Sequence, residues 1–161
     1  MNFRNQAVLL LATGFSVGRI PRAPGTFGAL LGIPVSFVLA KIGFGAAVLV
    51  LIGFIGFAVW ISGQAERLLG QKDASCIVID EVVGVMVTLA GITMTPLNLV
   101  AGFIAFRVLD IAKPFPAGFL DAQAAGGWGI VMDDVVAGVY GNIFLRVLSS
   151  FFFQGAIAWT E

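Results

Sequence analysis

The chain has no histidine, a single cysteine and few charged residues, and each shortage removes a class of function. Without histidine there is no imidazole to act as a general base, to carry a phosphoryl group or to bind zinc. One cysteine cannot form a disulfide framework or a cysteine-rich zinc site. Lysine and arginine number nine, as do aspartate and glutamate, so we expect no basic surface and no nucleic-acid partner.

Hydrophobic residues, by contrast, make up 59% of the 161 residues, and charged residues only 11%. A typical soluble domain is roughly 45–50% apolar and about 25% charged. The mean hydropathy of +1.02 shows the same bias. We therefore expect one integral-membrane domain covering residues 1–161.

Long uncharged windows predict where the membrane helices lie, because a spanning helix needs about 20 mainly apolar residues. The first two windows cover residues 23–40 and 42–65. A third, residues 82–106, is interrupted by a "TPLN" turn whose proline disfavours helix, so we expect two helices that extend into their charged flanks. A last helix is expected over residues 133–153. The fold class is then an all-α, polytopic membrane bundle of about four to five membrane helices plus a short N-terminal helix.

Threading these helices back and forth places most charged residues on one side of the membrane. Lys41 and the uncharged turn fall on the other side. The excess of lysine and arginine makes the charged side cytoplasmic by the positive-inside rule, and we expect the functional residues there. Arg146 falls inside the last helix, where we expect it to have a structural partner within the bundle.

Two pairs of adjacent acids stand among branched aliphatic residues: Asp80 and Glu81 in "IVIDEVV", and Asp133 and Asp134 in "IVMDDVV". An ionised carboxylate near a bilayer centre costs roughly 2.5–3.5 kcal/mol, so repeated pairs need compensation. Oxygen ligands suit hard cations such as Mg²⁺. The pairs therefore predict a magnesium site between facing helices, while pairing with the chain's own cations in headgroup water remains the alternative.

A glycine lies on the same helix face as an acid in each pair. Gly84 follows Glu81 by three residues, and Gly138 follows Asp134 by four. Small residues at these positions would let the two helices approach closely, although ordinary membrane helix packing explains them equally well.

Two further segments carry polar residues on the predicted cytoplasmic side. The loop "GFSVGRIPRAPGTFG", residues 14–28, contains Arg19 and Arg22 and leads into a helix N-terminus, which suits an anion, while a plain polar loop between helices remains the alternative. In "FRVLDIAKPFPAGFLD", residues 106–121, Arg107, Asp110 and Lys113 recur every three residues, as in a plain ion-pair ladder, before two prolines end the helix. The segment "AAGGWGIV", residues 124–131, predicts a flexible turn before the second acid pair.

Acids for a metal and cations for phosphate, together at a membrane face, indicate phosphoryl chemistry on a lipid headgroup. The expected nucleophile is water. A cysteine phosphatase needs arginine six positions after its nucleophile, and Val82 stands there after Cys76.

Three stretches, "GRIPRAPGTFGALLGIP", "DASCIVIDEVVG" and "FRVLDIAKPFPAGFLDAQAAGGWGIVMDDVVAG", resemble the signature blocks of the phosphatidylglycerophosphatase A family, in order and at similar spacing. The resemblance implies a magnesium-dependent hydrolase of the bacterial inner membrane that converts phosphatidylglycerophosphate to phosphatidylglycerol. It also implies functional roles for the matching residues: Asp80, Glu81, Asp110, Asp121, Asp133, Asp134, Lys113, Arg22, Gly25 and Thr26.

The residues and the resemblance together give one hypothesis. Magnesium ligands are expected at Asp80, Glu81, Asp133 and Asp134. Catalytic roles are expected for Asp110, Lys113 and Asp134. Substrate phosphate binding is expected at Arg19, Arg22, Gly25 and Thr26.

Two other classes of function remain open. A small cation transporter would also use acids within the membrane, but it predicts acids spread through the membrane depth. A lipid headgroup phosphotransferase would need clustered acids and magnesium, together with an Asp-Gly-x-x-Ala-Arg type signature that this sequence lacks. The oligomeric state is not predicted.

Overall fold

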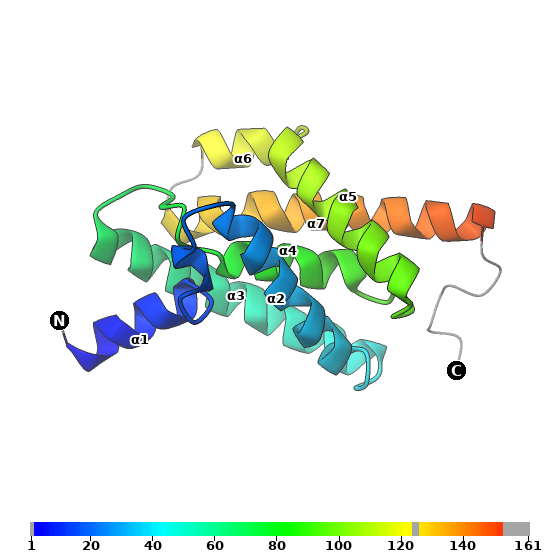
Figure 1. Ribbon diagram of the computed structural model, residues 1–161, viewed down its shortest axis with the longest axis horizontal. Helices are drawn as coiled ribbons and strands as arrows, with labels where there is room; N and C mark the ends of the chain where they lie inside the picture. Colours follow the sequence, from blue (N-terminus) through cyan, green and yellow to red (C-terminus); the bar gives the residue numbers. More distant parts are fainter. Residues whose placement is uncertain (1, 124–125, 153–161) are drawn as a thin grey trace.

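The computed structural model describes residues 2–123 and 126–152, and every regular element in this part of the chain is helical (Figure 1). The all-α prediction is therefore confirmed. In chain order the elements are α1 (Phe3–Ala12), η1 (Val17–Arg19), α2 (Pro24–Leu39), α3 (Phe44–Leu69), α4 (Ile79–Leu89), α5 (Pro96–Ala112), α6 (Ala117–Gln123) and α7 (Gly126–Phe152).

Helix α4 lies at the centre of the bundle and packs against α2, α3, α5 and α7. Beyond the two acids of its first turn it is almost entirely apolar, as expected of a helix surrounded by others, and nearly every residue in it is buried. Met86 contacts the core on the α3 side, whereas Leu89 packs with Phe106 and Leu145 on the α5 and α7 side. The first turn of α4 is consequently held from several directions.

The crossing of α4 and α7 depends on the two glycines that follow the acid pairs. A Cβ atom on Gly138 would lie 2.5 Å from the backbone oxygen of Gly84, and one on Gly84 would overlap the ring of Phe106. The expected close approach of the two helices is therefore present. It brings the acid-bearing turns of α4 and α7 beside each other.

The break in the third apolar window is confirmed, because α4 and α5 are separate helices. Thr95 caps α5 by accepting a hydrogen bond from the Asn98 amide at 3.1 Å, and Pro96 occupies the first turn, where its missing N–H costs nothing. Both helices extend into charged flanks, so that α4 includes the first acid pair and α5 includes Arg107 and Asp110.

The start of the last helix was predicted too late, since α7 begins at Gly126 and not near residue 133. Part of the expected flexible turn, residues 126–131, is helical; residues 124 and 125 lie outside the described residues. Packing explains the difference. Gly127 fits against the backbone of Val59 and Gly63 on α3, where any Cβ would overlap the Val59 carbonyl, so these glycines serve a helix crossing.

Among the described residues, only α3 is both long and apolar enough to cross a membrane. Helices α2 and α4 contain 16 and 11 residues, fewer than the roughly 20 that a span needs. The predicted bundle of four to five spans is therefore not confirmed.

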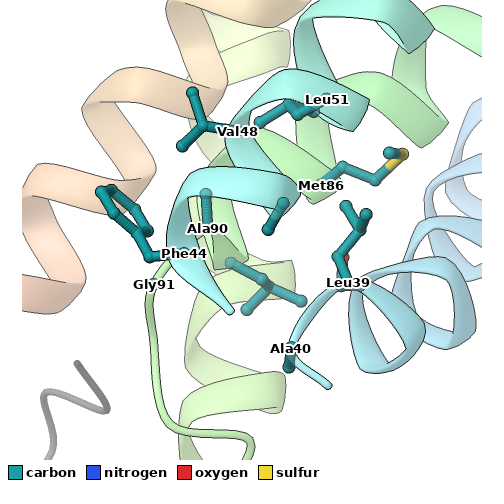
Figure 2. Close-up of a pocket in the computed structure, with 11 residues that line it drawn as sticks. Leu39, Ala40, Phe44, Val48, Leu51, Met86, Ala90 and Gly91 are labelled. Carbon is teal, nitrogen blue, oxygen red and sulfur yellow. The ribbon is translucent and has the colours of Figure 1, made fainter. Parts of the chain in front are cut away.

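The C-terminal end of α4 meets the turn between α2 and α3 in an apolar setting. Figure 2 shows the small hollow there, about 20 Å³ in volume, with Leu39, Phe44, Leu51 and Met86 around it. It is lined almost entirely by aliphatic and aromatic side chains. This hollow offers neither the space nor the polarity for a charged ligand.

Arg146 has its structural partners at this same end of α4. Its Nη2 donates to the Ala90 carbonyl at 3.3 Å, and its Nε donates to Asn142 Oδ1 at 2.8 Å. The Asn142 amide in turn donates to the carbonyls of Thr88 at 2.9 Å and Ala90 at 2.8 Å. The two side chains satisfy carbonyl groups that the end of a helix leaves without partners.

Candidate active site

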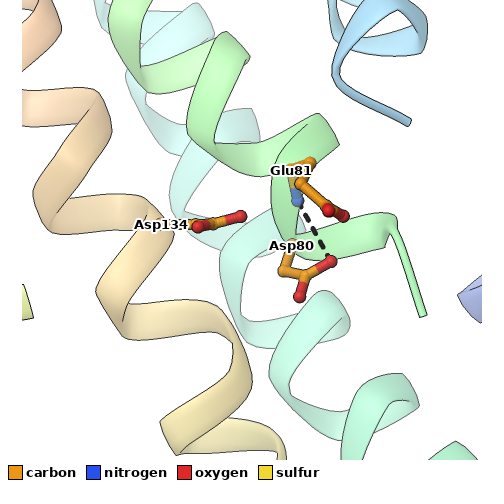
Figure 3. A group of neighbouring side chains, drawn as sticks. All are labelled: Asp80, Glu81 and Asp134. Atoms are coloured by element: carbon orange, nitrogen blue, oxygen red, sulfur yellow. Dashed lines mark hydrogen bonds between the residues drawn. The ribbon is translucent and has the colours of Figure 1, made fainter. Parts of the chain in front are cut away.

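Three carboxylates from two helices converge at the opposite, N-terminal end of α4. Asp80 and Glu81 lie in its first turn and Asp134 lies early in α7, and Figure 3 shows all three side chains directed toward one space. One oxygen of each carboxylate lies within 4.8 Å of the other two. The Glu81 amide donates to Asp80 Oδ1 at 3.1 Å, which fixes the orientation of that carboxylate (Figure 3).

These acids are withdrawn from solvent and close to one another. Asp80 is 7% exposed and Asp134 is 4% exposed. Burial raises the pKa of Asp80 well above its usual range, and the charges of Glu81 and Asp134 raise it further. Burial likewise raises the pKa of Glu81 and, strongly, that of Asp134. All three acids lie outside α3. Keeping all three ionised together is unfavourable unless positive charge is brought close to them.

The acid group fits a hard divalent cation. The donors are all carboxylate oxygens, which suit Mg²⁺ and similar ions, and they come close enough together to bind one ion. Glu81 Oε2 is buried and has no hydrogen-bond partner, so it retains a lone pair for a ligand. A bound cation would compensate both the repulsion among the acids and this unsatisfied oxygen.

Two basic side chains stand beside the acids. Arg107 Nη1 donates to Asp110 Oδ2 at 2.6 Å, so the first step of the alternative interpretation, an i, i+3 ion-pair ladder along α5, is present. Lys113 Nζ donates to Asp133 Oδ2 at 2.8 Å and so joins the end of α5 to α7. Because neighbouring helical positions point about 100° apart, Asp133 faces Lys113 while Asp134 faces α4.

The charged groups line a cleft of about 300 Å³. Its other walls come from the loop before α2 and from the loop between α3 and α4. The lining residues are Ala23, Pro24, Gly25, Asp73, Ser75, Ile77, Asp80, Glu81, Arg107, Asp110, Lys113, Ile130, Asp133 and Asp134.

Gly25 allows the first of these loops to approach the acids. A Cβ at this position would overlap Glu81 Oε1 and would lie 3.3 Å from Arg107 Nη1. Any larger residue at this position would therefore displace the Glu81 carboxylate.

Three residues that line the cleft have left-handed backbone conformations although none is glycine. Ala23 has φ 51°, Asp73 has φ 46° and Lys113 has φ 43°. Such a conformation costs an L-residue about 1–2 kcal/mol. Lys113 occupies the position after a helix where glycine is usually found. Strained backbone persists only where the surrounding structure holds it in place, and it is found most often at functional sites.

The residues expected to bind phosphate are not all brought together. Gly25 lines the cleft. Arg22 is exposed and directly precedes Ala23, which also lines the cleft, and Thr26 is half-buried in the first turn of α2. Arg19 is exposed and lines a separate hollow beside α1. The side chain of Asp121 lies outside the described residues.

Two polar residues of the cleft, Arg107 and Ser75, were given no role from the sequence, and for Asp73 the sequence left open whether it is a metal ligand or a supporting residue. Arg107 had a signal, because it shares a three-residue spacing with Asp110 and Lys113, but an ion-pair ladder accounts for that spacing equally well. Asp73 and Ser75 stand in the loop before α4, and only the folded chain brings that loop to the cleft.

Comparison with known proteins gives consistent matches. The family described as phosphatidylglycerophosphatase A matches residues 10–149. A protein of that name from Escherichia coli (strain K12) is 38% identical over 131 residues, covering 81% of this chain and 76% of the relative. Another of that name from Haemophilus influenzae (strain Rd) is 36% identical over 137 residues, covering 83% of each chain.

A third relative carries a different name. It comes from Bacteroides thetaiotaomicron, is 39% identical over 152 residues and is named, provisionally, a phosphatidylinositol-3-phosphatase; the match covers 86% of this chain and 91% of the relative. No solved structure matches the chain significantly.

Proposed function

The chain belongs to the phosphatidylglycerophosphatase A family and is a phosphatase, and we propose that it uses a divalent cation to release inorganic phosphate from phosphatidylglycerophosphate at a membrane face. The observation that carries this proposal is the group of three buried carboxylates beside Arg107 and Lys113 in one cleft.

In this proposal Asp80, Glu81 and Asp134 hold Mg²⁺. A bound magnesium ion polarises phosphoryl oxygens and lowers the pKa of a bound water. Asp133 was also expected to be a ligand, but its ion pair with Lys113 supports a different role, that of orienting the lysine ammonium. We propose this orienting role for Asp133.

Lys113 and Arg107 would neutralise the phosphate oxygens of the substrate. Both line the cleft, and Arg107 is held in position by Asp110. The backbone near Gly25 would border the phosphate, with Thr26 and Arg22 at its edge. Arg19 has the weakest support of the proposed phosphate-binding residues, because it lines another hollow.

The reaction would be a single displacement at phosphorus. A water oxygen forms a bond to phosphorus while the bond to the glycerol oxygen breaks, giving inorganic phosphate and an alcohol. Asp110, at the edge of the acid group, is our candidate to accept the proton that the water loses. The departing glycerol oxygen takes up a proton from water.

We propose that the protein lies in the bacterial inner membrane, and several features support association with a membrane. Helix α3 is long and apolar enough to span, and large apolar side chains are exposed on neighbouring helices, for example Phe37 on α2, Ile104 on α5 and Ile143 on α7. The cleft lies toward the end of α3 that carries Glu66 and Arg67, as expected for a site at the membrane surface. The positive-inside rule favours the cytoplasmic face.

A cation transporter has less support than a phosphatase. The three clustered acids share one end of α4 and one cleft, and the opposite end of that helix is enclosed by apolar residues and by the caps from Asn142 and Arg146. A continuous polar path along the bundle would be needed for transport.

The direct test is release of inorganic phosphate by the purified protein in mixed micelles with Mg²⁺, with EDTA as the control. Phosphatidylglycerophosphate and phosphatidylinositol 3-phosphate should be compared, because the relatives are named for these two substrates. We expect magnesium-dependent release with preference for the first lipid. Release that persists in EDTA would contradict the cation requirement, and absence of release would contradict the function.

A further inference from the structure

Outside the cleft, a second large hollow lies between α5 and α7 on the outside of the bundle. Its volume is about 490 Å³, and apart from Tyr140 every side chain lining it is apolar. Its walls include Ala101, Ala105 and Leu109 from α5, and Tyr140, Phe144 and Leu148 from α7. We call this hollow the α5–α7 groove. The lining residues Ile104, Val108 and Phe144 are 55%, 60% and 49% exposed, so the groove is open to the outside of the bundle.

The groove begins where the cleft ends. On α7, Tyr140 of the groove follows Asp133 of the cleft by seven residues, about two turns, so the two side chains lie on the same helix face. The Tyr140 hydroxyl donates to the Phe115 carbonyl at 2.9 Å, which ties the start of the groove to the segment that follows Lys113. The groove therefore continues from the Asp133 and Lys113 side of the cleft along α7, whereas on α5 Asp110 points about 100° away from its neighbour Leu109 of the groove.

Figure 1 shows α5 crossing α7 obliquely, with the C-terminal end of α5 and the N-terminal end of α7 toward the same side of the bundle, so each helix extends away from the cleft. From Leu109 back to Ala101, and from Tyr140 on to Leu148, each helix covers about 12 Å at about 1.5 Å per residue. The groove is thus an elongated apolar channel with its only polar side chain at the end near the phosphate site.

We propose that the α5–α7 groove binds one acyl chain of the lipid whose phosphate enters the cleft. This inference rests on the proposed function. A lipid held at Lys113 by its phosphate would present its chains at the start of the groove, and a hydrocarbon chain needs no hydrogen-bond partner along it. Small side chains at Ala101 and Ala105 leave room for such a chain.

The test compares two substrates in wild type and two variants. The substrates are dioleoyl phosphatidylglycerophosphate in mixed micelles and its deacylated headgroup phosphate. Ala105→Trp places an indole in the groove, and Val100→Trp is the matched control, because Val100 is 58% exposed on the same helix outside the groove. The measured quantity is the ratio of kcat/KM for the lipid to kcat/KM for the headgroup.

We expect this ratio to fall about tenfold in A105W, because chain burial is lost, and to keep its wild-type value in V100W. An unchanged ratio in A105W, or an equal fall in V100W, would overturn the proposal. Loss of activity on both substrates in A105W would also overturn it, because the groove would then support the fold and not the lipid. If the wild type hydrolyses neither substrate, the proposed function fails first.

A second measurement does not depend on how the variants fold. A phosphatidylglycerophosphate with a diazirine near the end of one acyl chain should label the wild-type protein on α5 or α7 residues of the groove. A phosphatidylcholine with the same diazirine is the control. Labelling on α2 or α3, or equal labelling of the groove by both lipids, would overturn the proposal in favour of ordinary contact with membrane lipid.

Discussion

The two ends of α4 differ in whether their polar groups have hydrogen-bond partners within the protein. At the C-terminal end, Asn142 and Arg146 satisfy the carbonyls of Thr88 and Ala90, and the neighbouring hollow is small and apolar. At the N-terminal end, Asp80 and Glu81 enter an open cleft with Asp134, and Glu81 Oε2 has no hydrogen-bond partner. A fold that completes its polar contacts at one end and leaves them incomplete at the other indicates structure at the first and ligand binding at the second.

The variant expected to change activity most is Asp134→Asn, at the ligand-binding end of α4. We expect phosphate release to fall roughly a thousandfold, because a ligand of the catalytic cation is lost. Thermal unfolding without added cation should occur at the same or a higher temperature, because one buried like charge is removed. Glu66→Gln on α3 is the matched control and should behave as wild type. A D134N protein with more than a tenth of wild-type activity would contradict the assignment.

Lys113→Gly tests the cleft while keeping every carboxylate, although Asp133 loses this ion-pair partner. Glycine suits the left-handed backbone at this position but also makes the unfolded chain more flexible, so the backbone change should alter the free energy of unfolding by no more than about 1 kcal/mol. Loss of the ammonium removes a phosphate-binding charge. We expect kcat/KM to fall about a hundredfold, as measured by phosphate release at saturating magnesium.

Lys113→Arg is the companion variant, since it keeps the positive charge at the same backbone position. We expect it to recover part of the lost activity. If K113G remained as active as wild type, the strain at this residue would have no functional explanation.

The opposite end of α4 should respond in stability and not in activity. Asn142→Ala removes the side-chain donor to the Thr88 carbonyl, one of the two donors to the Ala90 carbonyl and the acceptor of Arg146 Nε, so we expect a loss of about 1–3 kcal/mol in the free energy of unfolding. The remaining folded protein should keep its wild-type kcat, measured at a temperature well below the unfolding midpoint. A variant with normal stability and low kcat would reverse the proposed division of roles.

The smallest effect is expected for Ala23→Gly, which relieves a left-handed alanine in the cleft wall. Gains in the native state and losses from a more flexible unfolded chain should nearly cancel, within about 1 kcal/mol. Activity should stay within about twofold of wild type, because the residue contributes only backbone. A large loss of activity would mean that the Ala23 methyl group itself contacts the substrate.

Much of the fold follows from local patterns in the sequence. The proline at position 96 is sufficient to predict that α4 and α5 are separate, and the spacing of Gly84 and Gly138 from the acids predicts a close crossing. The early start of α7 could not be predicted in this way, because glycine near Gly127 usually favours a turn. Its helix depends on contact with Val59 and Gly63, which are distant in sequence.

The candidate site also has a part that the sequence predicts and a part that depends on tertiary packing. Adjacent acids in two places predict a cation site, but they do not say which member of each pair faces it. That choice depends on the rotation of α7, which turns Asp134 toward α4 and Asp133 toward Lys113. The three-residue spacing of Arg107 from Asp110 could be recognised in the sequence, yet the position of Arg107 beside Glu81 depends on tertiary packing.

The central claim is that Asp80, Glu81 and Asp134 together bind a divalent cation, and calorimetric titration with Mg²⁺ tests it without any substrate. The account predicts saturable binding by the wild type and by the Glu66→Gln control, and loss of that binding in Asp80→Asn and in Asp134→Asn. Equal magnesium affinity in wild type and Asp134→Asn would contradict it.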